Sequence, residues 1–251
     1  MLTALQHGGQ PDINALVGGG VQNLVPLRAL GLSLADLTDE ERTCARRLAW
    51  ARQEEPDGRA IPRKTHHAYL PGPDGYPPDW QPTGARVIHI VRDPRDVAIS
   101  WAHHAGITLT DAAAFLADES AHLGDDLSEG ASRLASWSTH ALSWAEQCDM
   151  PVLTIRYEDM AADPSHAVSL LADFVDLEVT AQRVAEVVEA CRFERLAAAE
   201  IVCGFREQSA VGRAFFRQGR SGAWREVLDD ETAAGIAARH SSTMERFGYQ
   251  P

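Results

Sequence analysis

The strongest constraint on the fold is a short apolar run that leads straight into the start of a helix. Residues 86–91, RVIHIV, are rich in β-branched side chains and apolar on both faces, which is typical of a central strand in a parallel sheet. The following residues, RDPRDVAISWAHHAG, predict a turn and a helix, because Asp93 suits the N-cap, Pro94 the first turn and Asp96 a capping box. A strand that passes directly into a helix is the repeating unit of an α/β fold.

Similar signals recur along the rest of the chain. Apolar spacing predicts helices over residues 1–7, 33–52, 110–116, 128–147, 163–174, 180–191, 192–203 and 229–247. A second buried strand is expected within residues 151–159, PVLTIRYED, and a short one within residues 60–66, AIPRKTH. Glycine and proline predict loops over residues 10–32 and 205–222. We therefore predict a single α/β domain over residues 1–251, with a mainly parallel sheet flanked by helices.

Charge and composition argue against several classes of protein. Aspartate and glutamate number 36 against 23 lysines and arginines, a formal net charge of -13, which disfavours a protein that mainly binds nucleic acid phosphates. No apolar run approaches the roughly 20 residues that span a bilayer, and the N-terminus lacks the basic region of a signal peptide. The four cysteines form no CxxC pair, and we interpret them as buried small side chains in a reducing compartment. We therefore expect a cytoplasmic protein that binds neither nucleic acid nor membrane.

The first candidate site is the arginine that follows the predicted strand. Arg92 stands at the carboxyl end of that strand, the edge where α/β proteins bind ligands. The next helix turns its free N–H groups and the positive end of its dipole to the same place, and Ser100 offers a hydroxyl two turns later. Together they predict an anion pocket, most naturally for a phosphate monoester. The alternative is a structural ion pair, in which the arginine only locks the turn by pairing with Asp93, Asp96 or Asp159.

The second candidate is the segment RKTHHAYL. Lys64 and His66 lie two residues apart, so an extended backbone projects both side chains to the same face. A cation and a base would then serve one reacting centre. The alternative is a solvated edge strand with two surface histidines, and the pattern taken alone favours this alternative.

The third candidate is FFRQGRSGAWRE, residues 215–226. The guanidinium groups of Arg217 and Arg220, with the backbone N–H of Gly219, could surround an anion, and burial of Trp224 would anchor the loop. The alternative is a flexible basic surface loop. In so acidic a chain, a local cluster of arginines favours binding; its members are Arg195, Arg206, Arg213, Arg217, Arg220 and Arg225.

Taken together, these segments resemble the sulfotransferases that use 3′-phosphoadenosine 5′-phosphosulfate (PAPS). RKTHH is similar to the family's Lys-Thr-His strand, and VRDPRDVAISWAHH to its strand, loop and helix for the 3′-phosphate. VLTIRYEDMAADP resembles the Tyr-Glu-Asp segment, FRQGRSGAWRE the Arg-Lys-Gly loop, and MERFGY a common C-terminal ending of bacterial members. The segments occur in the family's order. The resemblance covers the whole chain and implies the P-loop NTPase-like sulfotransferase fold.

The resemblance implies roles for the residues that bind the cofactor. Arg92 and Ser100 would bind the 3′-phosphate of PAPS and of its product, 3′,5′-bisphosphoadenosine (PAP). Arg217 and the backbone of Gly219 would close over the same phosphate. Gln218 stands where the family usually has a lysine, which would weaken this contact. The ring of Tyr157 would pack near the adenine of the cofactor.

The resemblance also implies a catalytic pair and a class of partner. His66 would be the general base that takes a proton from a hydroxyl or amine of a small-molecule acceptor, and Lys64 would steady the sulfuryl oxygens. An imidazole suits this task because its unperturbed pKa of about 6.5 leaves it largely neutral at pH 7. The family's chemistry needs no metal. A homodimer is compatible with the resemblance.

One part of the family's pattern has no counterpart. The family opens with a strand and a loop resembling Tyr-Pro-Lys-Ser-Gly-Thr-Thr-Trp, which holds the 5′-phosphosulfate, whereas MLTALQHGG resembles the helix after that loop. We therefore expect an N-terminally truncated fold, caused either by a start codon assigned too late or by a short native product. Such a chain is expected to bind the cofactor poorly and to turn over little. The alternative function is a non-catalytic relative that binds 3′-phosphoadenosine nucleotides or a partner.

Overall fold

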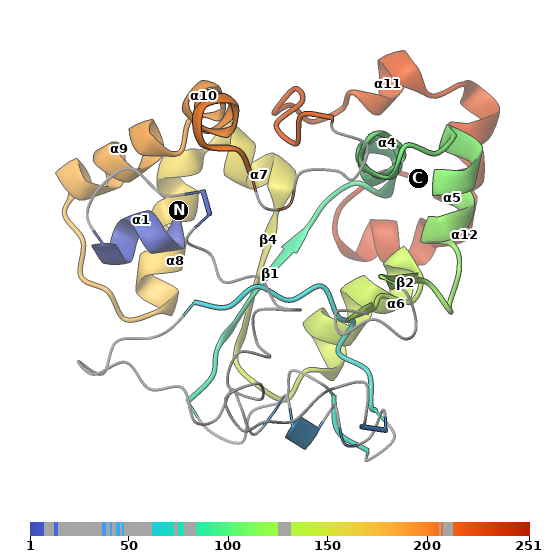
Figure 1. The fold of residues 1–251 in the computed structure, drawn as a ribbon, viewed down its shortest axis with the longest axis horizontal. Coiled ribbons are helices and arrows are strands. Elements are labelled where there is room, and N and C mark those ends of the chain that lie inside the picture. The colour runs from blue at the N-terminus through green and yellow to red at the C-terminus, as the bar shows by residue number, and fades with distance from the viewer. Residues whose placement is uncertain are drawn as a thin grey trace. The chain divides into compact units, whose positions relative to one another are not determined.

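The computed structural model describes residues 1–7, 13–14, 37–38, 41, 44–45, 47, 62–72, 75–77, 84–124, 132–205, 207 and 213–251 (Figure 1). The chain divides into two compact units that alternate along the sequence. The first unit comprises Met1–Ala15, Ile88–Ala117 and Leu153–Pro251, and the second comprises Leu16–Val87 and Asp118–Val152. The single domain over residues 1–251 remains a prediction.

The first unit holds most of the regular structure. Its elements in chain order are α1 (Leu2–His7), most of β1 (Val87–Val91), α4 (Pro94–Ala105), α5 (Leu109–Leu116), most of β4 (Val152–Arg156), α7 (Tyr157–Ala162), α8 (Pro164–Phe174), α9 (Ala181–Ala190), α10 (Phe193–Cys203), α11 (Trp224–Val227) and α12 (Asp230–Arg246). The second unit contributes β2 (His122–Leu123), β3 (Ser132–Arg133), α6 (Trp137–Leu142) and the π-helix η3 (Ser143–Gln147). No described helix is both long enough and apolar enough to span a membrane.

The sheet that positions the candidate site consists of two neighbouring parallel strands, β1 and β4. Both strands pass almost directly into a helix, β1 into α4 and β4 into α7 (Figure 1). The α/β class and the two strands expected from the sequence are therefore confirmed. Their predicted burial is only partly right, because Ile90 in β1 is 53% exposed and Ile155 is the one fully buried residue of β4. Because parallel strands end at one edge of a sheet, the residues that follow β1 and β4 come close together.

The core of the first unit forms where α1, α8 and α9 pack beside β4. Its buried members are apolar, and Val168 and Val187 are 0% and 1% exposed. The guanidinium of Arg183 on α9 donates to the carbonyls of Ala4 and Leu5, the latter at 3.4 Å. This contact satisfies acceptors that the α1 helix leaves open. The first seven residues therefore dock as a helix on the rest of the unit.

The start of α4 confirms part of the predicted cap and corrects another part. The side chain of Asp93 accepts from the N–H of Arg95 at 2.9 Å, as an N-cap does. The capping box with Asp96 is wrong. The N–H of Asp93 instead donates to Glu158 Oε1 on α7 at 3.1 Å. A carboxylate from the neighbouring strand–helix connection therefore completes the cap.

Two further predictions need correction. The helix expected over residues 128–147 is shorter, because residues 132–133 form β3, which pairs antiparallel with β2. Ser136 then caps α6 by accepting from Thr139 N at 3.1 Å, so the helix begins only at Trp137. In the expected strand over residues 60–66, the described residues 62–66 contain a single bridge at Lys64 and no strand.

Other predictions fall wholly or partly outside the described residues. Most of residues 10–32 and 33–52 lie there, although residues 41, 44–45 and 47 are helical. None of the four cysteines is fully buried: Cys44 and Cys203 are exposed, and Cys148 and Cys191 are half-buried. This corrects their interpretation as buried side chains.

Candidate anion-binding site

The candidate site is built around Arg92, which follows β1 and is half-buried. Its Nη1 lies 3.5 Å from Ser100 Oγ on α4, so the two predicted phosphate ligands are neighbours. Its Nη2 donates to the backbone carbonyl of Arg220 at 2.9 Å. Its guanidinium carbon lies 4.2 Å from the centre of the Tyr157 ring, at the start of α7. Residues from the ends of β1 and β4 and from the basic loop therefore meet at one arginine.

Arg217 supplies a second guanidinium to this place. It is half-buried, and burial is the main cause that lowers the pKa of its side chain. The charges of Arg92 and Arg220 lower this pKa further, while Asp96 opposes them. No hydrogen bond or ion pair connects the Arg217 side chain to any residue in the described part of the chain. A desolvated cation among other cations is the local setting that an anion stabilises.

The alternative interpretation of Arg92, a structural ion pair, is partly met by a long contact with Asp96. Its Nη2 lies 3.8 Å from Asp96 Oδ2. The same carboxylate, 1% exposed, accepts from the backbone N–H of Gly222 at 2.6 Å and of Trp224 at 2.9 Å. Asp96 is therefore occupied mainly with the backbone of the basic loop.

The turn at Gly219 has a strict steric requirement. Gly219 has a φ of +62°, and a Cβ atom built there would lie 2.2 Å from Cδ2 of Phe193. Only glycine fits this turn without displacing the ring. Gln218 is exposed, and its Oε1 accepts from Arg220 Nε at 3.3 Å, while Arg220 also pairs with Glu226 at 2.7 Å.

The N-terminal part of the loop is held by a residue that the sequence analysis missed. Glu200 on α10 is buried, and its carboxylate accepts from the N–H groups of Phe215 at 2.6 Å and Phe216 at 3.0 Å. On α4, a ring nitrogen of His103 lies 3.1 Å from the carbonyl oxygen of Ala214. A lone glutamate in an otherwise apolar run, AAAEIVC, was the available signal for such a role.

Lys64 and His66 lie in the second unit, and both are half-buried. The backbone carbonyl of His66 lies 3.3 Å from Nε2 of His140, and that of His67 accepts from Trp144 Nε1 at 2.8 Å. Burial lowers the pKa of His140, which favours its neutral form. Side chains of α6 and η3 thus fix the backbone of the predicted catalytic segment.

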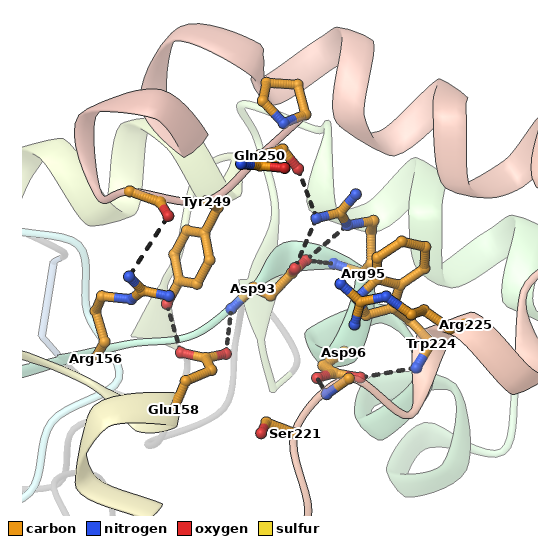
Figure 2. Close-up of a pocket in the computed structure, with 13 residues that line it drawn as sticks. Asp93, Arg95, Asp96, Arg156, Glu158, Ser221, Trp224, Arg225, Tyr249 and Gln250 are labelled. Atoms are coloured by element: carbon orange, nitrogen blue, oxygen red, sulfur yellow. Dashed lines mark hydrogen bonds and ion pairs between the residues drawn. The ribbon is translucent and has the colours of Figure 1, made fainter. Parts of the chain in front are cut away.

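A cavity of about 530 Å³ lies beside the start of α4 (Figure 2). The half-buried ring of Trp224 borders it, between the guanidinium carbons of Arg95 at 3.9 Å and Arg225 at 4.4 Å. Most of the charged groups around it already have partners within the protein; for example, Arg95 pairs with Asp93 at 2.8 Å, and Glu158 accepts from the hydroxyl of Tyr249 at 2.8 Å. The predicted phosphate ligands are not among its lining residues, which are Asp93, Arg95, Asp96, Arg156, Glu158, Ser221, Gly222, Trp224, Arg225, Gly248, Tyr249, Gln250 and Pro251.

Sequence comparisons agree with the motifs found above. Residues 53–248 match the family model described as the sulfotransferase domain. A flavonol 3-sulfotransferase of Flaveria bidentis is 26% identical over 183 residues, which cover 68% of this chain and 57% of the relative. Cytosolic sulfotransferase 16 of Arabidopsis thaliana is 33% identical over 180 residues, which cover 65% of this chain and 52% of the relative. The chain spans about half the length of these relatives.

Solved structures show the same fold. A retinol dehydratase in complex with androsterone and the inactive cofactor PAP has a TM-score of 0.59 at 23% identity, over 89% of this chain and 62% of that one. A mouse sulfotransferase complexed with PAP has a TM-score of 0.54 at 23% identity, over 72% of this chain and 65% of that one. With the family model matching residues 53–248, more than half of the sequence, the chain belongs to the sulfotransferase family.

Proposed function

We propose that this chain binds the 3′-phosphate of PAPS and PAP with Arg92, Ser100, Arg217 and the backbone N–H of Gly219. The observation that carries this proposal is the electrostatic interaction of two guanidinium groups from distant parts of the chain, beside a hydroxyl on α4. A phosphate there would give the Arg217 side chain a hydrogen-bonded anionic partner, which it does not have among the described residues. Both structural neighbours hold PAP, which supports the same ligand.

Two other predicted residues take more indirect parts in this proposal. Tyr157 holds the Arg92 guanidinium against its ring, so it orients the cation as well as lying beside the expected adenine. Gln218 interacts with Arg220 and brings no charge to the phosphate. The site therefore depends on the arginines more than a site with the family's usual lysine would.

We further propose that the protein transfers a sulfuryl group from PAPS to a hydroxyl or amine of a small-molecule acceptor. His66 would accept the proton that the acceptor loses as its new bond to sulfur forms, and the bond from sulfur to the leaving phosphate oxygen breaks. Lys64 would stabilise the charge on the sulfuryl oxygens. The hydrogen bonds that hold the backbone of residues 66 and 67 support this role, because a general base must be precisely placed.

The binding proposal is tested by calorimetric titration of the 251-residue chain with PAP and with adenosine 5′-phosphate (AMP), which lacks only the 3′-phosphate. We expect PAP to bind at least about tenfold more tightly, since charge-assisted hydrogen bonds contribute about 1.5–3 kcal/mol. Equal affinities would contradict the proposal.

The transfer proposal is tested with sulfur-labelled PAPS and a panel of phenolic, alcoholic and amine acceptors. The His66→Ala variant should lose turnover while its affinity for PAP stays within about twofold, as expected when only a proton acceptor is removed. His166→Ala, an exposed histidine on α8, is the matched control. Labelled product from the His66→Ala variant at the wild-type rate would exclude this residue as the base.

A further inference from the structure

Two buried carboxylates hold the basic loop on either side of Arg217. Asp96 binds the backbone at residues 222 and 224, and Glu200 binds it at residues 215 and 216. We propose that both are positioning residues for the 3′-phosphate site, acting through the loop backbone and not through contact with the ligand. This inference rests on the proposed function, because it concerns the same site.

Asp96 is suited to this role by its place in the fold. It lies in the first turn of α4 with its side chain 1% exposed, so its orientation is fixed by packing. Figure 2 shows its carboxylate directed at the loop near Trp224. The Asp96 carboxylate also lies 3.8 Å from the Arg92 guanidinium. Asp96 therefore connects three parts of the site: α4, which carries Ser100, the side chain of Arg92, and the basic loop.

Glu200 makes the corresponding contact at the other end. Glu200 is only 7% exposed, and its neighbours in the α10 sequence are small and apolar. Burial of a carboxylate is unfavourable unless donors surround it, and the N–H groups of Phe215 and Phe216 are such donors. These two bonds fix the backbone immediately before Arg217. Without these bonds, the backbone that carries Arg217 would no longer be held in place near Arg92.

Whether Asp96→Asn weakens or strengthens the binding of PAP distinguishes a positioning role from a purely electrostatic one. A carboxylate near a phosphate site repels the phosphate, so neutralising it should strengthen binding if charge were its only role. An asparagine at position 96 presents an amide NH₂ group where an N–H donor of the loop needs an acceptor. If Asp96 acts by holding the loop, Asp96→Asn must therefore weaken binding of the 3′-phosphate.

The experiment is a calorimetric comparison of PAP and AMP for the wild type, Asp96→Asn and Glu200→Gln. We expect each variant to reduce the preference for PAP over AMP by about 5-fold or more, since a buried donor left without its acceptor no longer holds the loop in place. AMP affinity should change by less than about threefold. A protein that is merely less stable but still folded would keep the preference. Exposed carboxylates on α8 and α10 provide matched controls, Asp173→Asn and Glu194→Gln.

The outcomes separate this inference from the proposed function. If the wild type shows no preference for PAP, the proposed function fails. If the wild type prefers PAP and both variants keep that preference, or Asp96→Asn binds PAP more tightly, the positioning role is wrong. Should a variant fail to fold, amide hydrogen exchange of the wild type tests whether the two carboxylates hold the loop backbone. Slow exchange of the N–H groups at residues 215, 216, 222 and 224 supports the two anchors, and exchange as fast as in a free peptide overturns them.

Discussion

The guanidinium carbon of Arg92 lies 4.2 Å from the centre of the Tyr157 ring. The first residue follows β1, and the second begins α7 directly after β4. Sixty-five positions separate them in sequence, but neighbouring parallel strands bring their carboxyl ends together. The ring therefore limits where the guanidinium can point, toward Ser100 and the basic loop.

Replacing Tyr157 with Leu should weaken PAP binding by about 3- to 30-fold, because a partly desolvated cation–π contact contributes about 0.5–2 kcal/mol. Tyr157→Phe keeps the ring and should bind PAP within about twofold of the wild type. Calorimetry with both variants checks this. Equal losses in the two variants would show that the hydroxyl, and not the ring, matters.

Replacing Gln218 with Lys should strengthen PAP binding, because it adds a positive charge next to Arg217 in the position where the resemblance expects one. We expect about a threefold to tenfold gain at low ionic strength, which shrinks as salt screens the exposed charge. The measurement is PAP affinity at two salt concentrations. Gln182→Lys, at an exposed position on α9, is the control for general charge effects. An unchanged affinity at low salt would mean that residue 218 points away from the phosphate.

Replacing Gly219 with Ala should destabilise the protein by about 2–4 kcal/mol, from a left-handed backbone and a clash with the Phe193 ring. Gly235 offers a matched control, because it lies inside α12 with open space where a Cβ would stand. Gly235→Ala should stabilise by about 0.5–1 kcal/mol. Chemical denaturation of both variants gives the free energies of unfolding. A harmless Gly219→Ala would contradict the described turn.

Local sequence signals predicted the elements that build the site, and long-range contacts explain what they missed. The strand at β1 and the cap at Asp93 follow from neighbouring residues, so they were predictable. Asp96 has the spacing of a capping box, but its partners lie 126 and 128 residues away. No local pattern reports a contact of that kind.

The predicted long helix over residues 128–147 failed for a different reason, which is closer in sequence. Apolar spacing continues through that segment, yet Ser136 bonds the backbone and starts the helix late, and β3 pairs with β2. Glu200 was missed because a single glutamate in a helix usually faces solvent. Its burial depends on the loop that folds back over α10.

The central claim is that Arg92 and Arg217 bind one phosphate, and a double-mutant cycle tests it most directly. PAP affinity is measured for the wild type, Arg92→Ala, Arg217→Ala and the double variant. Each single change should cost about 2–4 kcal/mol, and the two should be coupled by about 0.5–3 kcal/mol, with little effect on AMP. Single variants that bind PAP as tightly as the wild type, or losses that simply add, would contradict a shared phosphate.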